Sequence, residues 1–440
     1  MNPQTDLDLF IPHTRQGEYL TLPFEVPEGT AEMTLTYSYQ RHTTSQAPAG
    51  LGEFERSEKI NTIDLGLLSP DGRPVGASGS DKISVTVSET TATPGYRPCP
   101  LTPGTWQILV GAYHVAPEGV TVHYTLSFKP KALRLLMGDL HTHTIGSDGV
   151  LTASELATHA LRHGLDFLAI TDHNQLVSRD ALPIIEGITL IPGVEWTHYQ
   201  GHANFLGVGA PYDEPFFTNS LAETQARFAS AHARGALITI NHPFEEGCPF
   251  QFDLHSLHFD ALEVWNGPMR ESNLRAIGLW QTLLAAGQRI PITGGSDYHR
   301  DKLFQILGGP SMGVYALSAG QSDILAALKA GHSFITFAPK GPRLQLRCGD
   351  AIMGDEVPFQ DGLVLDIQAT GLQAGDILRL VSKDENLTLL QASGEGNFDA
   401  HFNAHLPVSQ PGFYRVEILR VFLPGVPPLP ALISNPMYFK

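Results

Sequence analysis

The sequence predicts an α/β protein in which a seven-stranded (β/α)7 barrel lies between two β-sandwich domains. In 132–338, apolar strand-like segments alternate with helical patterns, and about seven such units favour a parallel sheet closed into a barrel. In 1–131 and again in 339–440, short segments alternate between apolar and polar residues, with glycine and proline between them. That pattern is typical of antiparallel sandwiches. We therefore expect three domains with these bounds.

The two terminal regions share this alternation. In the first it is clearest in "EMTLTYSYQ" (32–40) and "KISVTVSE" (82–89). In the second it returns in "GLVLDIQAT" (362–370) and "FYRVEILRVF" (413–422). Alternation of this kind places one face of each strand in a core and the other in water. We expect the second region to be immunoglobulin-like.

The strands and helices of the middle region can be predicted individually. Each of four helical patterns ends at a glycine that can adopt the left-handed conformation of a helix cap, namely Gly164, Gly235, Gly287 and Gly331. The first pattern opens with Thr152 and has Glu155 three residues later, which is a capping box. The predicted strands are 134–141, 166–172, 188–195, 202–208, 236–241, 259–265 and 290–296.

The charge of the chain limits its partners. The 440 residues include 45 acidic and 28 basic ones, and the formal net charge is −17. Such a surface repels a phosphate backbone, so we expect a small-molecule substrate and no nucleic-acid polymer as partner. A polyanionic substrate would need a local positive site, which bound metal could provide.

The cysteines and the N-terminal residues indicate the cellular compartment of the protein. Cys99, Cys248 and Cys348 are odd in number and far apart, so they predict neither a disulfide framework nor a CxxC metal knuckle. The opening "MNPQTDLDLF" lacks the basic start and apolar core of a signal peptide, and no apolar run is long enough for a bilayer. We expect a cytoplasmic protein with no membrane partner. Association into a homo-oligomer stays open.

Metal-binding residue types gather at the ends of the predicted strands, where barrel enzymes build their active sites. Residues i and i+2 of a strand point the same way, so His141 and His143 face one space. Each such residue alone could be a turn or capping element, but their recurrence at one end of successive strands predicts a metal site. These residues are His141, His143, Asp172, His173, Glu195, His198, His202, His242, Asp297 and His299.

Five short sequence motifs contain most of these residues. Their order along the chain, over about 132–338, resembles that of the PHP (polymerase and histidinol phosphatase) superfamily. They are "DLHTHTIGSDG", "AITDHN", "GVEW" with a following His, "NHP" and "GGSDYHR". The flanking β regions, "ALEVWNG" and "ALKAGHSFIT" resemble the CehA/McbA type of metal-dependent hydrolase within it. The resemblance implies a distorted seven-stranded barrel with a trinuclear metal centre.

The resemblance also implies which residues hold the three ions. The first ion would be held by His141, His143, Glu195 and Asp297, the second by Glu195 as a bridge with His202 and His242, and the third by Asp148, His173 and His299. His198 is the alternative to His202, which we favour because it opens the strand "HANFLG". Imidazoles and carboxylates suit manganese, iron or zinc, and the identity of the metal ions stays open. Cys248, near His242, could be a further ligand or a plain buried thiol.

Such a centre predicts hydrolysis. Two cations held close together lower the pKa of a water between them from 15.7 to about 7, and the resulting hydroxide is the expected nucleophile. Asp172 is the expected partner of a ligand histidine outside the metal shell. The candidates for the general acid are His198 and, more weakly, Asp139.

Two sets of residues near the strand ends favour different substrates. Arg179, Arg270, Arg300 and Lys302 suit a phosphate group, although each could be a solvated loop charge. Among them Arg270 and Arg300 are the predicted catalytic residues, and with them we expect a phosphoesterase.

The aromatic residues provide the alternative. Trp196, Tyr199 and Trp265 could line a neutral pocket for an aryl carbamate or carboxylic ester, or they could be ordinary core packing. The PHP resemblance implies phosphoester hydrolysis, whereas the CehA/McbA type includes aryl carbamate hydrolysis. A weaker alternative is a non-catalytic module whose β domains bind a partner.

Overall fold

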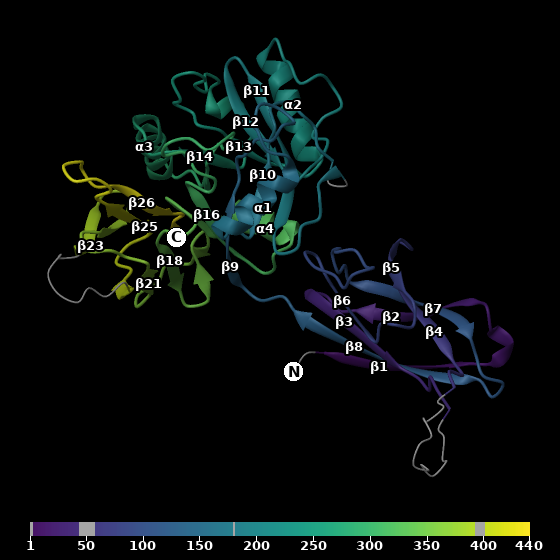
Figure 1. Ribbon diagram of the computed structural model, residues 1–440. Coiled ribbons are helices and arrows are strands. Elements are labelled where there is room, and N and C mark those ends of the chain that lie inside the picture. Colours follow the sequence, from purple (N-terminus) through teal and green to yellow (C-terminus); the bar gives the residue numbers. More distant parts are fainter. Residues whose placement is uncertain (1–2, 44–57, 179–180, 392–400) are drawn as a thin grey trace. The chain divides into compact units, whose positions relative to one another are not determined.

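The computed structural model describes residues 3–43, 58–178, 181–391 and 401–440 (Figure 1). The chain divides into two compact units, Met1–Ala132 and Leu133–Lys440. The predicted third domain, 339–440, has no separate unit of its own in this division, and its bounds stay a prediction.

The described residues of the first unit form two four-stranded antiparallel sheets, with strand orders β1-β8-β3-β6 and β2-β7-β4-β5. Their inward side chains form one hydrophobic core around Trp106 and Tyr124, both of which are almost completely buried. The antiparallel pairing agrees with the alternating pattern of the sequence. The strands are β1 (Gln4–Ile11), β2 (Tyr19–Val26), β3 (Thr30–Ser38), β4 (Thr62–Leu68), β5 (Pro74–Ser78), β6 (Ser84–Ser88), β7 (Gly104–His114) and β8 (Val120–Pro130).

The second unit is built on one long mixed sheet, which counts fifteen strands among the described residues. The seven strands predicted for the middle region are all present and neighbour one another in it, in the order β15-β14-β13-β12-β11-β10-β9. They are β9 (Arg134–Asp139), β10 (Phe167–Ile170), β11 (Thr189–His198), β12 (Gly201–Leu206), β13 (Leu237–Ile240), β14 (Ala261–Asn266) and β15 (Ile292–Gly295).

The predicted (β/α)7 barrel is wrong. The described part of the chain has four α-helices, too few for seven βα units, and β11 returns directly to β12 as an antiparallel hairpin. Nor is the sheet closed in the described residues. The end strand β15 pairs with β14, while beyond β9 the sheet continues into β16 (Ser311–Ala316) and β17 (Ser333–Thr336). The seven strands are therefore one part of an open mixed sheet.

The C-terminal strands continue this same sheet. β26 pairs with β17, and β25, β22 and β23 follow. Figure 1 shows β23, β25 and β26 of this continuation in yellow-green to yellow. A separate four-stranded sheet, β19-β18-β21-β24, shares their core. The strands of this region are β18 (Arg343–Cys348), β19 (Ala351–Ile352), β20 (Glu356–Val357), β21 (Val364–Thr370), β22 (Ile377–Val381), β23 (Asn386–Gln391), β24 (His401–Pro407), β25 (Gly412–Arg420), β26 (Leu429–Ser434) and β27 (Met437–Phe439).

The four predicted helices are confirmed. They are α1 (Ala153–His163), α2 (Leu221–Ala233), α3 (Glu271–Ala285) and α4 (Gln321–Ala330). The capping box of α1 is present, because the Thr152 hydroxyl accepts from the Glu155 N–H while the Glu155 carboxylate accepts from the Thr152 N–H. All four predicted cap glycines have φ between 75° and 86°. Among the described residues, no helix combines the length and apolar character needed to cross a membrane.

Candidate metal centre

The predicted ligands come together because they follow the carboxyl ends of neighbouring strands. His141 and His143 follow β9, His173 follows β10, and Asp297 follows β15, while Glu195 lies on β11. Parallel pairing of β9, β10 and β11 brings these ends to one edge. Bridges between Thr142 and Tyr298 and between His173 and Glu195 hold the segments beyond the strands together.

Four polar atoms converge at the centre of this edge. Glu195 Oε2 lies 3.4 Å from both His141 Nε2 and His143 Nε2. Asp297 Oδ1 lies 3.4 Å from His141 Nε2 and 3.1 Å from His143 Nε2. All four atoms are buried, yet none has a hydrogen-bond partner of acceptable geometry among the described residues.

This arrangement fits a metal ion. Leaving a buried polar atom without a partner costs about 1–3 kcal/mol, so four such atoms facing one point need an explanation. Nitrogen and oxygen ligands about 2.1 Å from a tetrahedral ion lie about 3.4 Å apart, which matches the observed separations. The central four atoms are therefore placed as ligands of a divalent cation would be.

A second group surrounds the other oxygen of Glu195. Its Oε1 atom lies 3.0 Å from His202 Nδ1 and 3.3 Å from His242 Nε2, and it accepts a hydrogen bond from Asn241 Nδ2 at 3.0 Å. Glu195 thus reaches both groups with one carboxylate, as a bridging ligand does. Of the two alternatives left open by the sequence, His202 lies in this group.

A third group lies around Asp148. Its Oδ1 atom is 3.2 Å from His299 Nε2 and 3.7 Å from His173 Nε2. These residues, with His143, form one of the sets whose ligand atoms lie within 4.8 Å of one another. Asp148 is largely exposed, and His173 also reaches Glu195 through Nδ1 at 2.8 Å. The three groups form a continuous cluster, and all nine predicted ligands belong to it.

Burial and neighbouring charges shift the pKa values of the residues in the cluster. Burial alone would lower the pKa of the His141 ring, but the carboxylates of Asp297, Glu263 and Glu195 hold that pKa well above its usual value. Burial alone would raise the pKa of Glu195, but the positive charge of His141 holds that pKa well below its usual value. The His141 ring therefore holds a proton more readily than a free imidazole, and a divalent ion bound at that ring would displace the proton.

Two of the predicted ligands have a strained backbone. His242 has φ of 25° and Asp297 has φ of 50°, in a region that residues with a side chain rarely occupy. Strain of this kind costs on the order of 1–3 kcal/mol and is concentrated at functional sites. Its occurrence at two residues of one cluster supports a functional role for the cluster.

Glu263 is a member of the site that sequence reasoning did not assign. It lies on β14, is 2% exposed, and contacts His141 Nδ1 through Oε1 at 3.0 Å. Its Oε2 atom accepts from the backbone N–H of His242 at 2.9 Å. Glu263 therefore fixes the tautomer of one predicted ligand and the backbone of another. The available signal was a carboxylate inside an otherwise apolar strand.

Replacing Glu263 by Gln should weaken metal binding about 10- to 100-fold, the usual cost of losing a hydrogen-bond partner of a ligand histidine. Gln keeps the size of the side chain but not the charge that orients the His141 ring. Titration of the metal-free protein with Mn²⁺ or Zn²⁺ measures the effect. The exposed Glu271→Gln on α3 is the control, and equal affinities of the two variants would contradict the role of Glu263.

Two buried aspartates hold the loops of the site. Asp172 accepts from the Thr144 N–H at 2.7 Å and from the Ser147 hydroxyl at 2.9 Å. It therefore orders the turn before Asp148, whereas the predicted contact with a ligand histidine is made by Glu263. Asp139 accepts from the N–H groups of Ser296 and Gly308 at 3.0 and 2.9 Å, and burial raises its pKa to about 6.

The other predicted catalytic residues lie at the periphery. His198 stacks on Trp196, and its ring nitrogens contact the Thr218 carbonyl at 3.0 Å and the Gln200 N–H at 3.1 Å. A ring held by two backbone groups is poorly placed to act as a general acid. Its catalytic role stays a prediction.

The basic side chains predicted to bind a phosphate group differ in exposure and in hydrogen-bond partners. Arg270 donates to Glu245 Oε1 at 2.9 Å, so its charge is already paired. Arg300 is exposed and donates from Nη2 to the carbonyl of Asp148 at 3.2 Å. Lys302 is exposed, and Arg179 lies outside the described residues.

The three aromatic residues do not form a rim together. Trp196 and Trp265 are 0% and 3% exposed and belong to the hydrophobic core of the second unit. Their indole N–H groups donate to the carbonyls of Phe216 and Gly267. Only Tyr199, 98% exposed, faces solvent among the three. The core-packing interpretation therefore applies to both tryptophans.

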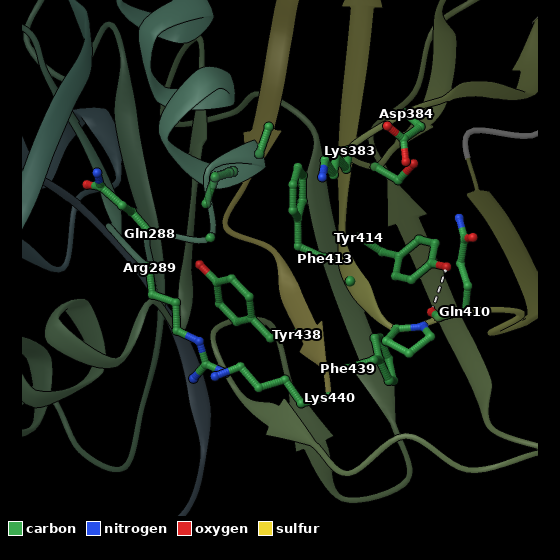
Figure 2. A pocket seen from close by; sticks show the side chains of 16 residues that line it. Gln288, Arg289, Lys383, Asp384, Gln410, Phe413, Tyr414, Tyr438, Phe439 and Lys440 are labelled. Carbon is green, nitrogen blue, oxygen red and sulfur yellow. Dashed lines mark hydrogen bonds between the residues drawn. The ribbon is translucent and has the colours of Figure 1, made fainter.

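A separate cavity of about 410 Å³ lies between the end of α3 and the C-terminal strands (Figure 2). Phe413, Tyr414 and Tyr438 form part of its wall, and Arg289 stacks on the Tyr438 ring at 4.6 Å. The predicted site residues are not among those that line it. This cavity is therefore distinct from the candidate metal centre.

Comparison with known proteins finds similarity to nucleases. No protein-family model matches the chain. The 5′-3′ exoribonuclease Rnm of Salmonella typhimurium is 34% identical over 152 residues, which cover 32% of this chain and 44% of that protein. The 5′-3′ exoribonuclease of Haemophilus influenzae is 39% identical over 80 residues, 17% of this chain and 29% of that protein. The chain thus matches less than half the length of these relatives.

Solved structures also resemble parts of the chain. A two-domain protein from Bacteroides vulgatus, described as containing a predicted PHP-like metal-dependent phosphoesterase, has 18% identity and a TM-score of 0.40, covering 69% of this chain and 95% of that one. An amidohydrolase from Chromobacterium violaceum has 16% identity and a TM-score of 0.25, covering 37% and 87%.

Proposed function

We propose that the chain is a metal-dependent hydrolase of the PHP type that cleaves phosphoesters. The observation that carries the proposal is the set of four buried, unpartnered atoms of His141, His143, Glu195 and Asp297, which face one point. A structural role would leave these atoms hydrogen-bonded to one another or to the backbone. Their arrangement is suited to hold a cation instead.

Three divalent ions would fit the three groups of the cluster. The central four residues would hold the first, Glu195 with His202 and His242 the second, and Asp148 with His173 and His299 the third. Bound ions of this kind supply an activated water and positive charge for the oxygen that becomes more negative as the bond breaks. The donor set of imidazoles and carboxylates suits manganese, iron or zinc.

The residues of the chain would prepare this site in distinct ways. Glu195 would fix the spacing of two ions because its two oxygens face separate groups of histidines. Glu263 would hold the His141 ring, so that Nε2 faces the centre. Arg300 uses one of its five N–H donors on the Asp148 carbonyl, which leaves others to bind a phosphate oxygen beside the third group.

The placement of the aromatic residues favours a phosphoester over an aryl carbamate or carboxylic ester. A neutral aryl group needs apolar walls, but Trp196 and Trp265 are packed in the core. A phosphate needs cationic groups, and the cluster with Arg300 provides them. The carbamate or ester hydrolase remains the alternative chemistry for the same centre, and the non-catalytic module is a weaker alternative still.

A second candidate substrate is the 5′ end of an RNA chain. Sequence similarity to two 5′-3′ exoribonucleases favours it, and the scissile bond would again be a phosphoester. The net charge of −17 opposes binding of a long polyanion, which is the reason for predicting no nucleic-acid partner. A short oligonucleotide held mainly at the metal centre would reconcile the two observations.

The test compares three substrates on the manganese-loaded protein: an aryl phosphate, an aryl N-methylcarbamate and a 5′-phosphorylated oligoribonucleotide. We expect hydrolysis of a phosphoester that stops on chelation and returns with metal. Release of mononucleotides from the oligoribonucleotide alone would select the exonuclease. Cleavage of the carbamate alone, or metal-independent cleavage, would overturn the proposal.

A further inference from the structure

Cys248 lies beside two of the proposed ligands of the second ion. Its Sγ atom is 3.8 Å from His242 Nδ1. Ligand atoms of Cys248, His202 and His242 all lie within 4.8 Å of one another, and the two imidazole rings meet edge to face at 5.1 Å between centroids. The chain's other cysteines, Cys99 and Cys348, do not belong to such a set among the described residues.

The backbone of the loop after β13 brings this thiol to its place. The Glu245 N–H donates to the His242 carbonyl at 3.0 Å, and the Cys248 N–H donates to the Glu245 carbonyl at 3.3 Å. Two successive turns therefore fold the chain back onto His242. A further bond from the Phe250 N–H to the Pro243 carbonyl, at 3.0 Å, closes the loop. The thiol is thus held against the ring by the local fold.

The separation of sulfur and nitrogen fits shared coordination. In a tetrahedral zinc site with Zn–S of about 2.3 Å and Zn–N of about 2.0 Å, the two ligand atoms lie about 3.5 Å apart. The observed 3.8 Å requires only a slightly wider angle. His242 presents Nε2 to Glu195 and Nδ1 to Cys248, so one ring faces both the carboxylate and the thiol.

We propose that Cys248, His202 and His242 form a thiolate-containing metal position that selects zinc over manganese. The thiol loses its proton to solvent when the ion binds. Sulfur with imidazole favours zinc, whereas manganese prefers oxygen-rich sites. His242 would bind this ion through Nδ1, so the ion would lie apart from the second ion, which faces Nε2 and Glu195 on the other edge of the ring. The proposal rests on the proposed function, because His202 and His242 also belong to the group assigned to the second ion. It predicts that this position differs in metal preference from the three positions of the proposed centre.

The experiment adds Co²⁺, which occupies zinc sites and absorbs in the near ultraviolet when a thiolate binds it, to the metal-free full-length protein. We expect this charge-transfer band in the wild type and in Cys99→Ser, a half-buried thiol of the first unit. We expect its loss in Cys248→Ser and in Cys248→Ala, with unchanged far-UV circular dichroism. The Ala variant provides the answer should the Ser variant fail to fold.

Zinc affinity provides the second measurement. The Cys248 variants should bind the weakest-held zinc at least about 10-fold less tightly, while their affinity for manganese changes less. Absence of the cobalt band in the wild type, or its persistence in both Cys248 variants, would overturn the proposal. A wild-type protein that shows the band but cleaves no phosphoester would support the thiolate site and refute the proposed function instead.

Discussion

Asp297→Asn should reduce metal-dependent phosphoester hydrolysis by about 10³-fold or more while the protein stays folded. The substitution keeps the shape of the side chain and removes its charge. Asp297 Oδ1 lies within 3.6 Å of nitrogens of three histidines, His141, His143 and His299, so an amide would weaken the hold on any cation there. Loss of a single group that stabilises developing charge commonly costs 10²–10³-fold, and loss of an ion costs more.

The effect is measured as kcat/KM with saturating metal, together with metal content and far-UV circular dichroism. Asp350→Asn, at an exposed turn between β18 and β19, is the matched control and should behave as the wild type. Full activity of Asp297→Asn would show that the central group does not hold a catalytic ion. Partial activity restored by excess metal would indicate weakened binding and agree with the proposal.

The elements of the second unit were predictable because their signals are local. Each predicted strand and helix of the middle region is present, and Gly164 and Gly331 end their helices in the left-handed conformation. The architecture was not predictable in this way. Strands such as β10, β13 and β15 have four residues, all buried, and such runs do not indicate which strand lies beside them.

The prediction of a closed sheet was wrong for the same reason. The antiparallel return of β11 into β12 takes the place of a crossover helix, and pairing of β17 with β26 carries the sheet into the C-terminal region. Both features depend on long-range hydrogen bonding between backbones. The resemblance implied a distorted seven-stranded barrel, and the described residues do not form a closed ring.

The site shows the same division between local and long-range information. The spacing of His141 and His143 predicted that they face one space, and both rings do lie within 3.4 Å of the same oxygens of Glu195 and Asp297. Glu263 was not assigned from the sequence, because its role arises from contact with a histidine 122 residues away. Trp196 raised a substrate hypothesis because a sequence does not reveal whether an indole near a strand end turns inward.

Glu195 unites the first and second groups, and its replacement therefore tests whether they share a ligand. Oε2 faces His141 and His143, and Oε1 faces His202 and His242. A glutamine at this position would retain one acceptor but turn an amide toward one set of nitrogens. We expect Glu195→Gln to lose activity at least as strongly as Asp297→Asn, by about 10³-fold or more.

The metal content separates the two variants. Asp297→Asn should release the first ion preferentially, whereas Glu195→Gln should release the first and the second together, because no other carboxylate is proposed to bridge them. Elemental analysis after gel filtration measures both, with the exposed Glu118→Gln as the control. If Glu195→Gln lost a single ion and the second group kept its metal, the histidines would suffice there and the bridge would be refuted.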